Sequence, residues 1–589
     1  MIKNWTQIVD PLNNIFLSAL VAMVPMIFIF WALIVRKMKG HYASLLATAI
    51  ALLVAIIIYR MPVGVALLST FHGILYGLFP ICWIVIAIIF LFNIVVKSGQ
   101  LEIIKHSMAS VTSDRRLQAL LIAFAFGAFL EGTAGFGAPV AITAALLVGL
   151  GFDPFYAAGI CLIANTAPVA FGAVGIPITV ASQVTGIPEM AISQMVGRTL
   201  PVLSLLIPFY LVILISGFRK SIEVLPAILV AGISFAFLQW FSSNYLGPAL
   251  PDIIGGGGCI LCMVIFLKYW KPKNVWRFKN EKDSTINREI HYTSMQVVKA
   301  WFPFILLTIM IIAWGLQPVK EALNSIGLIQ FKIPGIHNVI IDSNSNLVKH
   351  VFVFNYLSAS GSAIFITALI TIPLAGIKFN EGLKLFFSTL KQLRFPIITV
   401  AAILGFAYII NDSGIAITIA HALANTGFLY PFFAPILGWL GVFITGSDTS
   451  SNALFGKLQQ VTATSIGVDP LVTVAANSSG GVVGKMISPQ SIAVATASVG
   501  LVGKEANLFR FTVKHSFIML LLICLLTFAQ AYFIKWIIPS YPSQSVEKVV
   551  TQAPGCNKTI VSYRKLMKGR KCFFQKNLNE YFRTSVLRS

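Results

Sequence analysis

The chain has 589 residues, of which 57% are hydrophobic and 11% are charged, and its formal net charge is +23. Because a soluble domain carries roughly 25% charged residues, this composition excludes an ordinary soluble protein. The basic excess does not indicate nucleic-acid binding either, because Lys and Arg gather between apolar runs, as in loops that stay on the cytoplasmic side of a membrane.

Apolar stretches of about 20 residues recur along the chain, and each is long enough to cross a bilayer as a helix. The first, Ile15 to Val35, is followed by basic residues, which is typical of a retained span and not of a cleaved leader. Some of the runs are too short or too interrupted to cross, so they are predicted to be half-spans or re-entrant pieces. The predicted apolar segments are 12–35, 42–59, 80–96, 117–130, 138–150, 155–181, 199–217, 224–242, 253–270, 300–316, 351–373, 395–421, 428–445, 449–463, 470–500 and 514–537.

This pattern predicts an all-α polytopic membrane protein with about 12 to 14 transmembrane helices. The basic loops place the N-terminus and the stretch Gln317–Val348 outside the cell. The predicted parts are an N-terminal transmembrane half at 1–268, a basic cytoplasmic loop at 269–299, a C-terminal transmembrane half at 300–540 and a basic, disordered tail at 541–589.

The two predicted halves resemble each other. Gly151-Phe-Asp-Pro154 matches Gly467-Val-Asp-Pro470, and each is followed by an Ala-Asn pair. The spacing from that Asn to a later Pro is 12 residues in both halves, from 165 to 177 and from 477 to 489. Phe129-Leu-Glu-Gly-Thr133 also resembles Phe443-Ile-Thr-Gly-Ser447. We therefore predict an internal repeat, which is typical of secondary transporters. Asp153 and Asp469 precede prolines and are predicted to cap helices.

Four segments combine helix breakers with small hydroxyl or amide residues. Non-helical backbone is tolerated inside a membrane only where it is buried in protein or lines a cavity. The N-termini of the resulting half-helices direct amide N–H groups at an anion, although small residues also serve simply for close helix packing. The segments are FLEGTAGFGAPVAI (129–142), IANTAPVAFGAVGIPIT (163–179), FITGSDTSSNALFG (443–456) and AANSSGGVVGKMISPQS (475–491).

Polar side chains in these segments are the predicted substrate-binding residues. Lys485 is the candidate for binding the anionic group, because it lies within the second-half broken helix. The hydroxyl and amide candidates for a carboxylate and an adjacent hydroxyl are Thr133, Asn165, Thr166, Ser447, Thr449, Ser450, Asn477, Ser478 and Ser479.

Acidic residues in apolar runs are the predicted proton-coupling residues. A charge inside a membrane costs at least about 2.5–3.5 kcal/mol on insertion scales, so Glu131, Asp412 and Asp448 are expected to serve transport or to pair with a cation. No catalytic residue, cofactor or metal site is predicted: the GGVVGK stretch lacks the Ser or Thr of a phosphate loop, and no zinc-ligand or nucleophile motif is present.

The four segments resemble the signature stretches of the L-lactate permease family, which also contains glycolate permeases. The stretches GPALPDI (247–253) and LSASGSA (357–363) add to the resemblance, which runs from the N-terminus to about residue 540. It implies a symporter of the bacterial cytoplasmic (inner) membrane that takes up lactate, and often glycolate, together with a proton. The implied partners are these small anions, protons and membrane lipid, with no nucleic acid.

Other functions stay open at this point. A dicarboxylate carrier should offer two cationic anchors, and Lys457 is a weaker second candidate beside Lys485. A sodium site would use the same carbonyl and hydroxyl oxygens that these motifs supply. A membrane enzyme would convert its substrate chemically, and a channel would not concentrate it.

Overall fold

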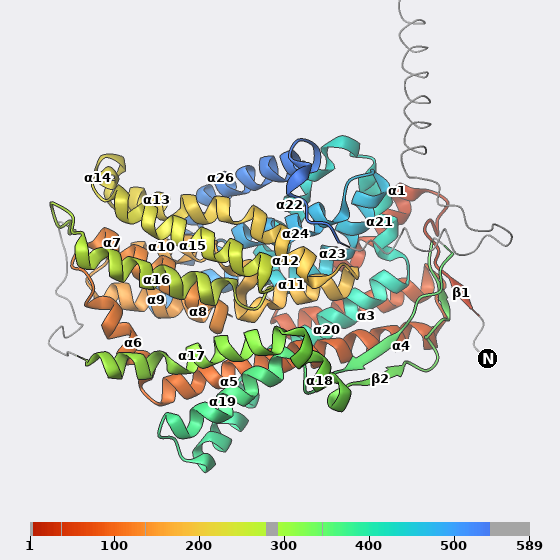
Figure 1. The fold of residues 1–589 in the computed structure, drawn as a ribbon. Coiled ribbons are helices and arrows are strands. Elements are labelled where there is room, and N and C mark those ends of the chain that lie inside the picture. The colour runs from red at the N-terminus through yellow and green to blue at the C-terminus, as the bar shows by residue number, and fades with distance from the viewer. Residues whose placement is uncertain (1–3, 37, 136, 279–291, 344, 542–589) are drawn as a thin grey trace, which may run out of the picture. The chain divides into compact units, whose positions relative to one another are not determined.

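The computed structural model describes residues 4–36, 38–135, 137–278, 292–343 and 345–541. Residues 1–540 form one compact unit, which Figure 1 shows to be built almost entirely of helices. The predicted tail at 541–589 lies outside the described residues except for Tyr541, as does the segment 279–291 of the predicted loop at 269–299. The boundaries between the predicted loop and the two halves therefore stay a prediction.

The all-α membrane fold is confirmed. Within the described residues, 11 helices are long and apolar enough to cross a membrane, or 12 when the pair Pro154–Ala164 and Val169–Thr185 is counted as one span bent by 65°. This number meets the predicted range only at its lower end, because several apolar runs are short half-helices. Large apolar side chains such as Phe16, Leu53 and Phe237 are exposed on the outer helices, as lipid contact requires.

The elements before residue 270 are one short strand and a series of helices. A π-helical segment, Leu120–Phe126, lies between α7 and α8. Their bounds are β1 (Trp5–Thr6), α1 (Ile15–Ala22), α2 (Val24–Ile34), α3 (Gly40–Ile57), α4 (Val63–Tyr76), α5 (Trp83–Lys97), α6 (Gln100–Ala109), α7 (Arg115–Ala119), α8 (Gly127–Thr133), α9 (Ala138–Gly149), α10 (Pro154–Ala164), α11 (Gly172–Thr185), α12 (Glu189–Thr199), α13 (Pro201–Ser216), α14 (Phe218–Ile222), α15 (Leu225–Tyr245) and α16 (Pro251–Tyr269).

The later elements include three short strands in the stretch after α18, where β1 pairs with β3 and β2 with β4. Their bounds are α17 (Ser294–Gly315), α18 (Gln317–Gly327), β2 (Ile329–Lys332), β3 (Ile340–Ile341), β4 (Val351–Phe354), α19 (Ser360–Leu374), α20 (Phe379–Asp412), α21 (Ile415–Ala424), α22 (Tyr430–Thr445), α23 (Asp448–Ser465), α24 (Pro470–Lys485), α25 (Pro489–Ser498) and α26 (Glu505–Tyr532).

The matched stretches of the two halves have the same element order. In the first half, α8 and α9 are joined by a short break and are followed by the interrupted helix α10–α11. In the second half, α22 and α23 stand in the place of α8 and α9, and α24 and α25 form the interrupted helix. Asp153 and Asp469 cap α10 and α24 as predicted, each accepting from a backbone N–H two residues further on at 2.9 Å.

The two interrupted helices start at opposite ends of α26. The ring of Phe155, at the start of α10, lies 5.6 Å from that of Phe511. Asp469, just before α24, lines the same pocket as Tyr532. Phe511 and Tyr532 are about 21 residues apart on one helix, or about 32 Å, which is close to the thickness of the hydrocarbon core. The repeated units therefore enter the membrane from opposite sides, as inverted repeats of transporters do.

The two repeats also pack crosswise. In each half, the pair of helices joined by a short break (α8–α9 and α22–α23) forms a hairpin. The second helix of each interrupted pair contacts the second helix of the other half's hairpin, so that α11 packs against α23 and α25 against α9. At the first contact, the Asn452 amide donates to the Pro177 carbonyl at 3.0 Å. At the second, a side chain on Gly137 would approach Val494 to 3.4 Å. The hairpin tips and helix breaks of both halves thereby meet in the interior.

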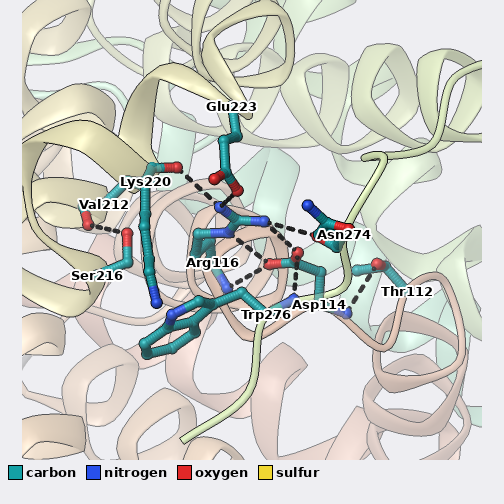
Figure 2. Close-up of polar contacts among 9 residues, drawn as sticks. All are labelled: Thr112, Asp114, Arg116, Val212, Ser216, Lys220, Glu223, Asn274 and Trp276. Carbon is teal, nitrogen blue, oxygen red and sulfur yellow. Dashed lines mark hydrogen bonds and ion pairs between the residues drawn. The ribbon is translucent and has the colours of Figure 1, made fainter.

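A buried ion pair ties the start of α7 to two other segments. Figure 2 shows the Arg116 guanidinium beside the Asp114 carboxylate, at 2.7 Å, and the Glu223 carboxylate, at 2.9 Å. Arg116 also donates to the carbonyls of Lys220 and Asn274, and the Trp276 N–H donates to Asp114. By the positive-inside rule, the neighbouring basic residues predict that this end of the molecule faces the cytoplasm.

Replacing Arg116 should therefore destabilise the protein. Arg116→Gln leaves the fully buried Asp114 carboxylate without its cation, and breaking a buried pair in this way costs about 3–5 kcal/mol. We expect the melting temperature of the purified protein in detergent to fall by several degrees. Size-exclusion chromatography of samples heated to increasing temperatures measures this change. Arg219→Gln is the matched control, because Arg219 is exposed. Equal melting of the two variants would contradict this account.

Candidate functional site

The first-half site forms where α8 ends and where α10 gives way to α11. Glu131 on α8 is only 3% exposed, and the Asn165 amide donates to its Oε2 at 3.0 Å. A Cβ on Gly172 would lie 2.7 Å from the other carboxylate oxygen, so only glycine fits there. Ala173 and Val174 adopt left-handed backbone angles, with φ of 46° and 61°. Such strain costs of order 1–3 kcal/mol per residue and gathers at functional sites.

The second-half site is a chain of hydrogen bonds between α23 and α24. Ser478 donates to the Asp448 carboxylate at 2.8 Å, and the Asn452 amide donates to Ser478 at 2.6 Å. Asn477 donates to the Asn452 carbonyl oxygen at 2.9 Å, and Gln459 donates to Asn477 at 3.2 Å. Two of the four predicted segments, 443–456 and 475–491, therefore join into one polar network, and Asn452 extends it to Pro177 of α11.

Lys485 lies at the C-terminal end of α24 and is 7% exposed. Its ammonium donates to the carbonyl of Gly446 at 2.7 Å, which satisfies the C-terminal end of α22. Lys485 also interacts electrostatically with Asp448, the first residue of α23. A cation and a carboxylate are therefore held near each other at the tip of the second hairpin.

The tips and breaks touch one another at glycines. A Cβ on Gly135, at the first tip, would lie 3.1 Å from Ala173 in the first break. A Cβ on Gly446, at the second tip, would lie 2.3 Å from Gln490, just inside α25. The N-termini of α9, α11, α23 and α25 all lie at these points. The helix ends therefore offer backbone N–H groups and positive partial charge to an anion.

Several buried polar atoms in this region have no hydrogen-bond partner among the described residues. They are Oδ1 of Asn165, Oγ1 of Thr166, Oδ1 of Asp448 and Oγ of Ser479. Burying a polar group without a partner costs about 1–3 kcal/mol. A small polar ligand that reached these atoms would recover that energy, and the atoms come from both halves.

Not every predicted site residue joins this arrangement. The Thr133 hydroxyl donates to the Phe129 carbonyl of its own helix, at 3.0 Å. Ser447 caps α23 by accepting from the Ser450 N–H at 3.2 Å, and Thr449 is half-buried beside it. Asp412 belongs to a different cluster, where it accepts from Ser69 at 2.5 Å and lies 3.5 Å from Nε2 of His350.

Sequence reasoning missed three polar residues of the interior. Asn452 and Gln459 lie on the buried face of α23 and join the second-half network, but only their hydrogen bonds distinguish them from packing residues. Asp252, at the start of α16, is 1% exposed. It stands within the GPALPDI stretch, and its position in an apolar run was the signal for it. No group of three His, Cys, Asp or Glu side chains in the described ranges could hold a metal ion.

Comparisons with known proteins show the family to which the chain belongs. A family profile described as L-lactate permease matches residues 18–534. The L-lactate permease of Bacillus subtilis (strain 168) is 53% identical over 561 residues, covering 91% of this chain and 100% of that protein. The L-lactate permease of Escherichia coli (strain K12) is 51% identical over 548 residues, covering 91% and 100%. Glycolate permease GlcA of the same strain is 49% identical over 549 residues, covering 90% and 98%. The chain therefore belongs to the L-lactate permease family, as a multi-pass transporter of the bacterial cytoplasmic membrane.

Proposed function

We propose that this protein takes up L-lactate and related 2-hydroxymonocarboxylates such as glycolate by symport with protons. The names of its relatives support the substrates. The observation that carries the proposal is the buried Lys485 ammonium, which donates to the Gly446 carbonyl two residues before the buried Asp448, near buried polar atoms that lack partners among the described residues. A site with one cation suits a monocarboxylate better than a dicarboxylate, because the second candidate, Lys457, donates to Gln460 at 2.9 Å.

In the proposed binding mode, the substrate carboxylate lies near Lys485 and the half-helix N-termini. Its 2-hydroxyl group and remaining oxygen bond to the amide and hydroxyl groups predicted from the sequence. Ser479, Asn165 and Thr166 are the strongest of these, because each has an unpartnered buried atom. The other proposed ligands are Thr133, Ser447, Thr449, Ser450, Asn477 and Ser478. Of these, the side chains of Thr133, Ser447, Asn477 and Ser478 already make hydrogen bonds to protein groups, and those of Thr449 and Ser450 make none among the described contacts.

Glu131, Asp448 and Asp412 are the proposed proton-coupling residues. An anion entering a cell moves against an inside-negative potential of about 2.3 kcal/mol per 100 mV, and a proton carried with it removes that penalty. Glu131 and Asp448 each lie at one of the two hairpins, beside the proposed substrate groups. Asp412 lies beside His350, close to the stretch predicted to face outside, and would exchange protons on that side.

Transport itself would follow from the inverted arrangement of the repeats. Because the interrupted helices enter from opposite sides, movement of one bundle against the other can open the same central groups first to one side and then to the other. The crosswise contacts of α11 with α23 and α25 with α9 are the surfaces that such a movement would shift.

The purified full chain in proteoliposomes tests the function. We expect labelled L-lactate to accumulate above equilibrium under an inward proton gradient without sodium, and a protonophore to abolish the accumulation. Accumulation that survives the protonophore and requires sodium would contradict proton coupling. The absence of lactate and glycolate flux under either gradient would contradict the proposed substrates.

Loss of the Lys485 charge should abolish most uptake. Lys485→Ala removes the cation proposed to bind the carboxylate, and truncating one partner of a buried charge pair costs about 2–5 kcal/mol, so we expect initial uptake to fall at least about 30-fold. Lys504→Ala is the matched control, because Lys504 is exposed just before α26. Uptake by the Lys485 variant equal to the control's would remove Lys485 from the site.

A neutral residue at position 448 should separate exchange from accumulation. Asp448→Asn retains an oxygen that accepts from Ser478 but cannot carry a proton. Because exchange of internal for external lactate needs no net proton movement, we expect exchange to continue and proton-driven accumulation to be lost. Asp469→Asn is the control, since Asn also caps helices well. Normal accumulation by the Asp448 variant would exclude it from coupling.

A further inference from the structure

Asp252 lies in close contact with the helix that carries Glu131. A Cβ on Gly132 would be only 2.7 Å from the Cβ of Asp252, and one on Gly256 would be 2.5 Å from the backbone nitrogen of Phe129. Helices α8 and α16 therefore cross almost backbone to backbone, which the glycines permit. At this crossing the two carboxylates are near enough to interact electrostatically.

Asp252 lies in the first turn of α16, where an acidic residue ordinarily caps the helix. Its contacts differ from those of the capping residues in this protein. The capping residues Asp114, Asp153 and Asp469 each accept from a backbone N–H at 2.9 Å. Neither carboxylate oxygen of Asp252 has a well-formed hydrogen bond among the described residues: the nearby Gln239 side chain on α15 interacts with it, but its amide donates to the Ala167 carbonyl at 3.1 Å. With only 1% exposure, such a carboxylate is too costly to bury as an anion without some other compensation.

Among the described residues, no basic side chain forms an ion pair with either carboxylate. Helix α8 packs against α5, α9, α10, α11, α16 and the π-helical segment, and α16 packs against α15. Helix α17 also contacts α8, through Trp301 and Phe304 against Phe129. The basic residues on all these elements are Lys97, Lys268 and Lys299, and Lys299, near the start of α17, is exposed. Lys97 pairs with Glu381 at 3.2 Å, and Lys268 is about 24 Å along the helix from Asp252. The other titratable groups on these elements are Tyr156, Cys161, Tyr245, Cys259, Cys262 and Tyr269.

Two adjacent carboxylates without a cation are stable when they share one proton. In a medium of low dielectric constant, two like charges strongly disfavour each other, so a pair of this kind binds a proton as a unit. Asn165 orients Glu131 toward this arrangement, and its own Oδ1 and the neighbouring Thr166 hydroxyl remain unpartnered. The pair therefore adjoins the break at which the substrate is proposed to bind.

We propose that Asp252 is a further proton-coupling residue and that it holds the transported proton jointly with Glu131. This inference rests on the proposed function, because it needs proton symport to occur. On the outer side, the pair takes one proton from water to become a carboxyl and a carboxylate. On the cytoplasmic side, the carboxyl O–H bond breaks and the proton returns to water.

The test uses the full chain in liposomes that contain a fluorescent pH indicator. An inward lactate gradient drives protons inward in the wild type, which acidifies the lumen. For Asp252→Asn we expect the acidification to fall at least about tenfold, while exchange of labelled lactate continues and loses its dependence on pH. Asp252→Glu should restore acidification. Asp153→Asn, at an exposed cap, is the control.

The outcomes separate this inference from the function on which it rests. Wild-type acidification together with normal acidification by Asp252→Asn would overturn the inference and leave proton symport intact. Loss of both exchange and acidification in a variant that elutes as a folded protein would make Asp252 structural and would also overturn it. Wild-type lactate uptake that needs sodium and leaves the lumen pH unchanged would overturn both.

Discussion

Lipid offers no hydrogen bonds, so each helix that breaks inside the membrane must find partners for its backbone ends within the protein. In this molecule those partners come from neighbouring breaks. Lys485 donates to the Gly446 carbonyl at the buried C-terminal end of α22, Ser447 caps α23, and Asn452 donates to the Pro177 carbonyl of α11. Because these backbone groups need hydrogen-bond partners, the hairpin tips and the interrupted helices of both halves lie together. The candidate site consists of the polar groups at these contacts.

The same requirement explains why glycine is frequent at these contacts. Gly172 and Gly481 each face a buried carboxylate, at distances that exclude any side chain. Gly132 and Gly256 let α8 and α16 approach until their backbones nearly touch. Close approach also reduces the room for water, so charges placed here interact more strongly than they would at a surface. Packing and electrostatics are therefore determined by the same residues.

Much of the fold was readable from the sequence because its signals are local. The breaks after Asn165 and Lys485 follow from Gly and Pro, and the caps at Asp153 and Asp469 follow from the prolines after them. The contacts between halves are not local, so no periodicity could pair α11 with α23. Apolar runs also do not reveal whether a helix crosses or turns back, which is why the sequence predicted a range of spans and the structure meets only its lower end.

The candidate site divides in the same way. Segments rich in Gly, Ser, Thr and Asn located both carboxylates, Glu131 and Asp448, and Lys485. They did not distinguish Asp412, whose partners Ser69 and His350 are distant in sequence and form another cluster. Asp252 was hidden because an acidic residue after a proline is the ordinary start of a helix. Its burial and its lack of a capping hydrogen bond distinguish it from the caps at Asp153 and Asp469.

The repeats share a backbone plan but differ in charge, and this difference supplies a route to coupling. In the matched spacing, the position of Lys485 corresponds to Ala173, so the first half has Glu131 and Asp252 without a cation, whereas the second has Asp448 beside Lys485. An unprotonated first-half pair would repel an anion approaching Lys485, and a bound proton would weaken that repulsion. Because such coupling is reciprocal, the bound anion would in turn hold the proton, so both would cross together.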